Sequence, residues 1–411
     1  MGGDFFGWLL MLLSFPVTLL SKRTRGHHKT LIACWAGLGA HHVIALANSY
    51  MFRVPGAGPD TRRFHYAAAH WEVAHSLHGY TYTRALGALY EVFGESVFLG
   101  HQFSIMAFAL SLIVFVELIY TLGQERHVFY LVLAFGLLPG PLIHTSLMLR
   151  EPFQVLFFLL CIYLFVRIRQ GENSVATFVS ALLAVVAFST LHNGLAVFAP
   201  LFGVAGFLWA LGARREVGIL FGVALLATAP LLLPKVIAKI SEQSVQVERV
   251  VEGGGLEYIA NYRELGEEGR TGYNISLNLS NPLLAASTVP AVLFAYFFLP
   301  MPWQVSSPLD VYAMLEGWLR GALFFGAYVY YKRGERLPEW AFVFLSGLAL
   351  EAMWGIGTFN WGQGLRHHVV AGGVFLLAGG GGLLDYHVAR KRRDILSRRR
   401  ANRAKPTVQQ E

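Results

Sequence analysis

The chain of 411 residues is poor in charged side chains and in cysteine. Aspartate, glutamate, lysine and arginine make up 14% of it, against roughly a quarter in soluble globular domains. Both cysteines, Cys34 and Cys161, lie within apolar runs, where a thiol behaves as a small hydrophobic group. We therefore expect no disulfide framework and no ordinary soluble domain.

Common cofactor motifs are also missing. The chain has no Gly-x-x-x-x-Gly-Lys-Ser/Thr loop, which argues against an ATP-driven pump contained in this chain. It has no Cys/His zinc spacing, and the adjacent histidine pairs at 27–28, 41–42 and 367–368 would point in different directions on a helix. The net charge of +8 comes from short basic blocks beside apolar runs, as the positive-inside rule produces, so no nucleic-acid partner is expected.

Apolar residues dominate what remains, since 55% of the chain is hydrophobic and the mean hydropathy is +0.48. Apolar runs of membrane-spanning length recur from end to end, so the sequence predicts an all-α, polytopic membrane helix bundle. Alternation of the basic turns predicts an N-terminus outside and about eleven spans: 5–20, 31–49, 97–122, 129–149, 153–166, 175–191, 194–211, 217–233, 311–331, 340–356 and 369–384.

One apolar run does not fit this alternation. If 282–299 crossed the membrane, the basic turn after Tyr331 would lie on the wrong side, so we expect 282–299 to be re-entrant or to lie at the outer surface. One transmembrane domain then covers 1–389, and a basic cytoplasmic tail, which meets membrane lipid, covers 390–411. The predicted external loops are 50–95, 235–281 and 357–368, the first containing interfacial amphipathic helices.

Charged residues within the predicted spans should face the protein interior or a wet cavity, because they are costly to place in lipid. They are Glu117, Glu316, Arg320 and Glu351, and the i,i+4 spacing of Glu316 and Arg320 predicts an internal ion pair. The run Gly379–Gly382 lies inside the last span, where it permits close helix approach or a kink.

The predicted topology gathers polar side chains on the non-cytoplasmic face, where we place the chemistry. The candidates are Asp60, Arg62, Arg63, His65, Arg150, Glu151, His192, Arg263, Arg366 and His367. Each also has a structural interpretation. Asp60 could cap a helix, and Glu151 could be stabilised by the dipole of the helix that it begins. Arg366 could anchor a span at the membrane interface, and His192 could be an interior histidine whose hydrogen bonds are satisfied.

Short motifs at these positions resemble a known superfamily. Asp60-Thr-Arg-Arg-Phe-His-Tyr-Ala-Ala-Ala and Arg150-Glu151-Pro-Phe-Gln-Val-Leu-Phe-Phe-Leu-Leu are similar to the first and second external loops of GT-C integral-membrane glycosyltransferases. The stretch from Asn360 to His368 resembles the last external loop of bacterial exopolysaccharide and O-antigen polymerase-like members.

The resemblance implies roles for these residues. Asp60 would be the general base toward an acceptor hydroxyl or a ligand of Mg²⁺ or Mn²⁺, and Glu151 would be the second acid. Many members have a further acid after the first, where this chain has Thr61, so metal dependence stays open. Phosphate would be bound by the cationic candidates Arg62, Arg63, Arg150, Arg366 and His367. The remaining candidates on the same face, His65, His192 and Arg263, would bind other parts of the substrate.

The sequence thus predicts a glycosyltransferase of the bacterial cytoplasmic membrane, active on the periplasmic side, which is either a polysaccharide polymerase or a single-sugar transferase. Its partners would be a polyprenyl-linked sugar donor, a glycan acceptor and polysaccharide-export components. Trp71, Trp303, Trp361 and Tyr258 are candidates for stacking on sugar rings. The alternative is a flippase for lipid-linked oligosaccharides, which would place functional polar groups inside spans and on both faces. A third interpretation is a structural subunit of an export complex.

Overall fold

The computed structural model describes residues 2–54, 58–70, 80–212, 270–275, 282–332 and 338–403, and within these ranges every regular element is a helix. The only extended pairing there is an isolated antiparallel bridge between Gly272 and Asn360. The all-α prediction is confirmed for these ranges.

The helices follow one another as α1 (Gly2–Val17), α2 (Lys22–Gly26), α3 (His28–Tyr50), α4 (Gly58–Ala69), α5 (Tyr80–Phe93), α6 (Val97–Thr121), α7 (Val128–Leu137), α8 (Pro139–Ser146), α9 (Glu151–Arg169), α10 (Val175–Ser189), α11 (Asn193–Ala210), α15 (Pro282–Phe298), α16 (Pro308–Lys332), α17 (Pro338–Gly357), α18 (Trp361–Phe375) and α19 (Gly381–Arg403). A π-helical turn, Leu376–Gly380, joins α18 to α19.

Several of these helices are long and apolar enough to cross a membrane, as expected for a multi-pass membrane protein. The described residues contain six such helices, or seven if the bent pair α7 and α8 forms one span. The predicted span 129–149 is this bent pair, whose halves meet at 55° beside Pro139. The predicted spans 175–191 and 194–211 form the shorter helices α10 and α11, and 217–233 lies outside the described residues.

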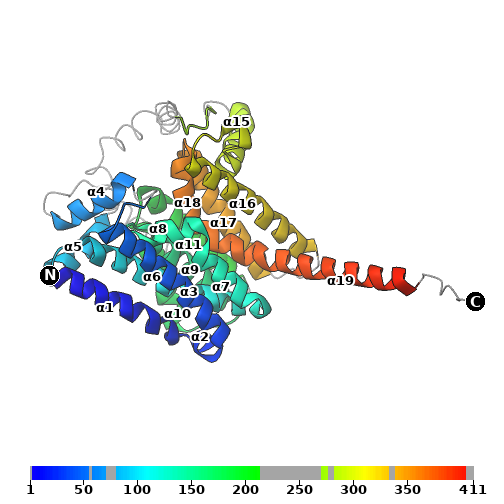
Figure 1. Cartoon of the computed structure of the whole chain (residues 1–411), viewed down its shortest axis with the longest axis horizontal. Coiled ribbons are helices and arrows are strands. Elements are labelled where there is room, and N and C mark those ends of the chain that lie inside the picture. The colour runs from blue at the N-terminus through cyan, green and yellow to red at the C-terminus, as the bar shows by residue number, and fades with distance from the viewer. Residues whose placement is uncertain are drawn as a thin grey trace, which may run out of the picture.

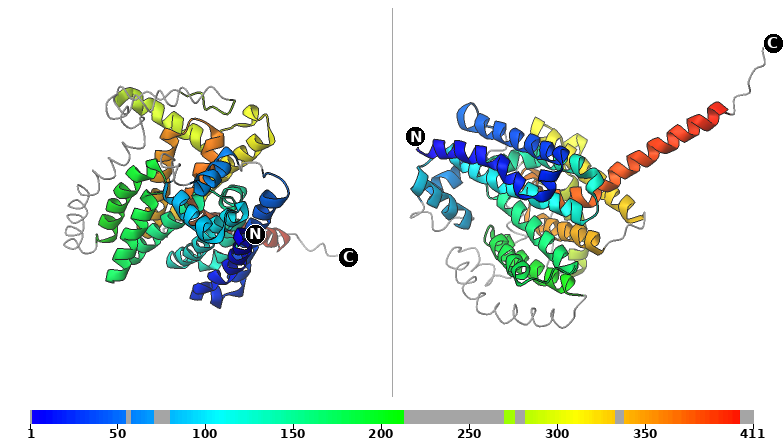
Figure 2. Two further views of the ribbon diagram at one scale, coloured as in Figure 1. Left: turned by 90° about the vertical axis from the view of Figure 1, so that its left-hand side faces the viewer. Right: turned by 90° about the horizontal axis from the view of Figure 1, so that it is seen from below.

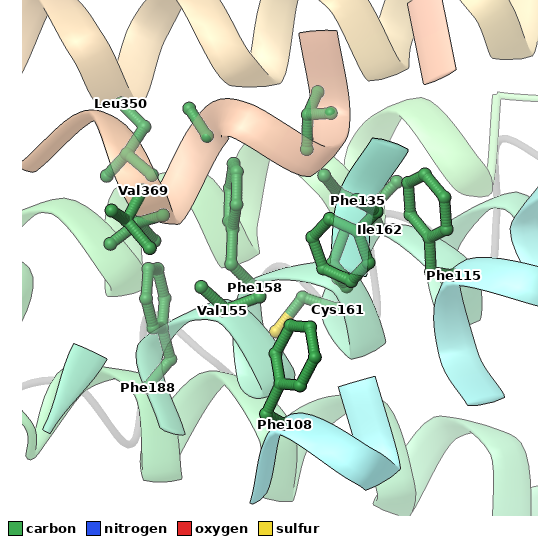
Figure 3. Packing of buried hydrophobic residues seen from close by; sticks show 14 of the residues in the cluster. Phe108, Phe115, Phe135, Val155, Phe158, Cys161, Ile162, Phe188, Leu350 and Val369 are labelled. Carbon is green, nitrogen blue, oxygen red and sulfur yellow. The ribbon is translucent and has the colours of Figure 1, made fainter. Parts of the chain in front are cut away.

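The core is centred on α9, which packs against α6, α10, α11 and α18. Within it, Phe108, Phe135, Phe158 and Phe188 lie around Cys161 and Val155 (Figure 3). Large apolar side chains turned inward from every neighbouring helix leave α9 almost wholly buried. This burial fixes the position of its N-terminal residues.

The bundle has two sides that meet at α9. Helices α1, α3 and α6 pack together on one side, and α16, α17 and α18 form the other (Figure 1). The α4–α5 pair lies at the end near the N-terminus, which agrees with helices in the predicted loop 50–95. Helix α19 packs against α16 and then projects away from the bundle (Figure 1 and the right view of Figure 2).

The predicted interior charges all have partners. Arg320 Nη1 lies 3.5 Å from Glu316 Oε2, which confirms the predicted pair. Glu351 is fully buried against His368, with 2.6 Å between Oε2 and Nδ1. Glu117 accepts a hydrogen bond from Ser21 at 2.7 Å and pairs with Arg23 at 3.3 Å. Paired charges in the interior are what the cost of burying a lone charge predicts.

The first two glycines of the run Gly379–Gly382 end the π-helical turn Leu376–Gly380, and the other two begin α19. The carbonyl groups of Leu377 and Ala378 accept hydrogen bonds from Gln124 Nε2 at 2.8 Å and Trp340 Nε1 at 2.9 Å. A side chain at Gly379 would overlap the backbone of α16 at Leu323. The predicted close approach of two helices is therefore confirmed.

Candidate functional site

The N-terminal ends of five helices, α4, α9, α11, α16 and α18, and the C-terminal ends of two, α8 and α17, meet around one cavity of about 660 Å³. Helix N-termini carry unsatisfied N–H groups and the positive end of the helix dipole, so their convergence favours an anionic ligand. The arginines that line the cavity add formal positive charge: Arg63, Arg150, Arg270 and Arg366. Asp60 and Asp310 are the acids that line it.

Arg366 bridges the two predicted acids, Glu151 and Asp60. Its Nε donates a hydrogen bond to Glu151 Oε1 at 2.6 Å, and its Nη1 donates to Asp60 Oδ2. The side chain of Glu151 is 3% exposed, whereas that of Asp60 is 44% exposed. The structure thus brings together residues that lie 215 and 306 positions from Arg366, with Asp60 open to the cavity and Glu151 buried behind Arg366.

Arg150, at the start of α9, is a buried cation. The residue is 8% exposed, and its Nε and Nη1 have no hydrogen-bond partner among the described residues. Its guanidinium lies 5.8 Å from the centre of the Phe64 ring. Burial lowers the pKa of Arg150 to about 10, so the side chain stays charged at neutral pH. An unsatisfied buried cation that lines a cavity fits an anionic ligand.

Arg270 forms a hydrogen-bonded ion pair, whereas Arg150 interacts with Glu151 and Asp60 only through their charge. Its Nη1 donates to Asp310 Oδ2 at 2.5 Å, and Trp361 Nε1 donates to Asp310 Oδ1 at 3.0 Å. Burial would raise the pKa of the Asp310 carboxyl, but these hydrogen bonds hold it well below its usual range. The backbone around Thr271 also pairs with the start of α18, since Trp361 N donates to Thr271 O at 3.1 Å. Asp310 therefore links the segment around Arg270 to the start of α18 on this side of the cavity.

An aromatic corner lies on the side of α11 and α17. The rings of Trp354 and His367 stack with centroids 4.3 Å apart, and His192 meets Trp354 edge-on at 4.6 Å. His367 Nδ1 and Thr358 Oγ1 share a hydrogen bond of 2.8 Å. His192 also caps α11, because its Nδ1 accepts from Gly194 N at 3.0 Å. Both predicted histidines thus line the cavity while filling local structural roles.

Other predicted residues lie elsewhere. Arg62 is exposed and does not line the cavity. His65 does not line it either, since it lies 3.0 Å from Glu95 and shares a 2.9 Å hydrogen bond with the Tyr90 hydroxyl. Burial lowers the pKa of His65, although Glu95 acts in the opposite direction.

The aromatic residues predicted to stack on sugar rings also differ in whether they line the cavity. Trp361 lines the cavity, whereas Trp303 is largely exposed and does not. Arg263, Trp71 and Tyr258 fall outside the described residues.

A divalent cation finds no ligand set around Asp60. Among the described residues, no group of at least three histidine, cysteine, aspartate or glutamate side chains is close enough to hold a metal ion. The nearest strong partner of Asp60 is the cation Arg366. The described residues therefore do not fit a metal centre, and no chemical step is assigned to one.

Sequence reasoning missed several lining residues, namely His144, Asp310, Tyr312, Trp354 and Gln363. Asp310 carries a signal for a helix start but none for a role in the site, because it follows Pro308 in the first turn of an apolar run. Trp354 carries none, since it lies in the middle of an apolar run.

Comparison with known proteins identifies no relative of this chain. No protein-family model, no curated protein and no solved structure matches this chain. What the cavity can do follows from its own residues.

Proposed function

We propose that the chain is a membrane glycosyltransferase that uses a polyprenyl-phosphate- or diphosphate-linked sugar or oligosaccharide. The observation that carries the proposal is that Asp60 and Arg150 line the same cavity. One is a carboxylate open to solvent, and the other is a buried guanidinium with unused donors. Transfer of a sugar from a lipid phosphate needs a proton acceptor and a cationic site for phosphate.

The proposed reaction assigns each group a task. The acceptor hydroxyl oxygen forms a bond to the anomeric carbon while the bond from that carbon to the phosphate oxygen breaks, and the electron pair stays on the phosphate. Asp60 takes the hydroxyl proton, and Arg150 binds the phosphate oxygens through its free N–H groups. Arg366 holds Asp60 at the rim and is itself fixed by buried Glu151.

The direction of α9 supports a cavity on the non-cytoplasmic side. Arg150 and Glu151 lie at the cavity end of α9, while Arg167 and Arg169 lie in its last turn. Because basic residues beside a span favour the cytoplasm, the cavity faces the other way in this proposal. The proposal includes a bacterial inner membrane, a GT-C-like arrangement of about eleven spans, and a re-entrant 282–299 segment. α15 is consistent with the last, as a 17-residue helix with an internal proline.

The experiment supplies purified protein in liposomes with an extract of lipid-linked glycans. We expect wild-type product that disappears in Asp60→Asn and falls strongly in Glu151→Gln, with Arg62→Gln as a control on the same helix as Asp60. Product length separates a polymerase from a single-sugar transferase. Movement of lipid-linked glycan between leaflets without any product would contradict the proposal and favour a flippase.

A further inference from the structure

His144 differs from the other buried histidines of the described residues. It is 7% exposed, makes no hydrogen bond to any described residue, and its Nδ1 is fully buried without a partner. Every other buried histidine in these ranges has at least one hydrogen bond: His41, His42, His101, His127 and His368. An unsatisfied buried imidazole is costly, so a missing partner needs an explanation.

The fold holds His144 at the cavity wall. Helix α8 begins at Pro139 after the 55° bend, and Glu316 Oε1 accepts a hydrogen bond from Gly140 N at 2.8 Å. The next residue, Thr145, shares a 2.7 Å hydrogen bond with His41. The anchored helix places His144 in the lining of the cavity that also contains Arg150, Asp60 and Arg366.

The surroundings of His144 select the kind of ligand. Helix α8 packs against α3, α6, α7, α9 and α18. These helices and the facing α16 carry the following charged or titratable groups: His41, His101, Arg150, Glu151, Glu316, Arg366 and His367. Glu151 is held by Arg366, and Glu316 by Gly140 and Arg320. The imidazole of His144 therefore lines the cavity beside the guanidinium of Arg150, and a ring N–H together with guanidinium N–H groups suits phosphate oxygens.

We propose that His144 is a catalytic residue that contacts the leaving phosphate oxygen of the sugar donor. This inference rests on the proposed glycosyltransferase function. As the bond from the anomeric carbon to the phosphate oxygen breaks, the electron pair moves onto that oxygen, and a His144 N–H donates a hydrogen bond to it. His144 keeps its proton, because Asp60 accepts the proton of the acceptor hydroxyl. A donor aimed at developing charge lowers the barrier more than it strengthens ground-state binding.

The test combines sugar transfer with binding of inorganic diphosphate to the full-length protein in detergent. His144→Leu removes the donor at similar volume, and His144→Gln keeps an N–H donor. The matched control is His70→Leu, just after the end of α4, because His70 is exposed and its only hydrogen bond among the described residues is to the backbone carbonyl of Tyr66.

We expect His144→Leu to lower kcat by roughly 100-fold with a smaller change in the acceptor KM, and to weaken diphosphate binding by about 10-fold. His144→Gln should keep kcat within about 10-fold of wild type, and His70→Leu should match wild type. Unchanged kcat and diphosphate affinity in His144→Leu would overturn the inference. So would equal losses in His144→Leu and His144→Gln, because these would indicate a packing role.

A second ligand identifies the source of the phosphate. A short-chain prenyl diphosphate should bind more tightly than inorganic diphosphate and lose affinity in His144→Leu, whereas binding of the inorganic ion alone would contradict a lipid-linked donor. If wild-type protein shows no transfer yet binds diphosphate through His144, the glycosyltransferase proposal fails while the phosphate contact stands. If transfer occurs and ignores His144, only the present inference fails.

Discussion

Removing Arg366 should destabilise the protein mainly through Glu151. In Arg366→Met the carboxylate of Glu151, which is 3% exposed, loses its only hydrogen-bonded partner among the described side chains. Breaking a buried pair in this way costs about 3–5 kcal/mol, and because the charge of Arg150 still attracts Glu151, we expect a loss at the lower end of this range. Asp60 is 44% exposed and can be solvated, so its pair with Arg366 should contribute only about 0–1 kcal/mol.

Two double-mutant cycles separate these contributions. Equilibrium unfolding in mixed micelles is measured for Arg366→Met, Glu151→Gln, Asp60→Asn and the two double variants. The Arg366–Glu151 cycle should give a coupling of about 2 kcal/mol or more, and Arg366→Met/Glu151→Gln should recover most of the lost stability. The Arg366–Asp60 cycle should give less than about 1 kcal/mol. Equal couplings, or a larger one for Asp60, would refute the assignment of Glu151 as the buried anchor.

Further predictions concern pH and packing. Because burial lowers the pKa of His65 in the folded protein, the unfolded chain takes up its proton first as the pH falls below about 6.5. The thermal midpoint should therefore fall toward acid pH less steeply in His65→Gln than in wild type or in the exposed-residue control His70→Gln; equal slopes would contradict this. Gly379→Ala should lower the unfolding free energy by about 1–3 kcal/mol, because its methyl group would overlap the backbone of Leu323. Gly372→Ala, which has open space, should not lower it, and a similar loss in both would refute the packing account.

The sequence predicts the helical class and part of the site for physical reasons. Apolar runs in a chain with few charges can satisfy their backbone only as helices, which is why the all-α class was predictable. Asp60, Arg150, Glu151 and Arg366 were predictable as neighbours because alternation of the spans puts their helix ends on one face. Charge alone, however, did not indicate that Arg366 would bridge the acids.

His144 and Asp310 depend on packing that no local pattern encodes. His144 lies in the apolar run 129–149, where a straight span would make it an interior residue. From the sequence we expect this run to be one span; the chain bends by 55° between α7 and α8, and the direction of α8 depends on contacts with α3, α6 and α18. Asp310 acquires its role only when Arg270 and Trp361, far apart in the chain, meet it. Arg62 shows the converse, because a charge beside a site residue points elsewhere on its helix.

The central claim is that Asp60 serves the chemistry and contributes little to the fold. The most direct measurement determines sugar-transfer rate and unfolding free energy on one preparation of Asp60→Asn beside wild type. We expect Asp60→Asn to lose product with a stability change below about 1 kcal/mol, since the Asp60 carboxylate is partly solvated. Wild-type transfer by Asp60→Asn would contradict the account, and so would loss of product that follows unfolding.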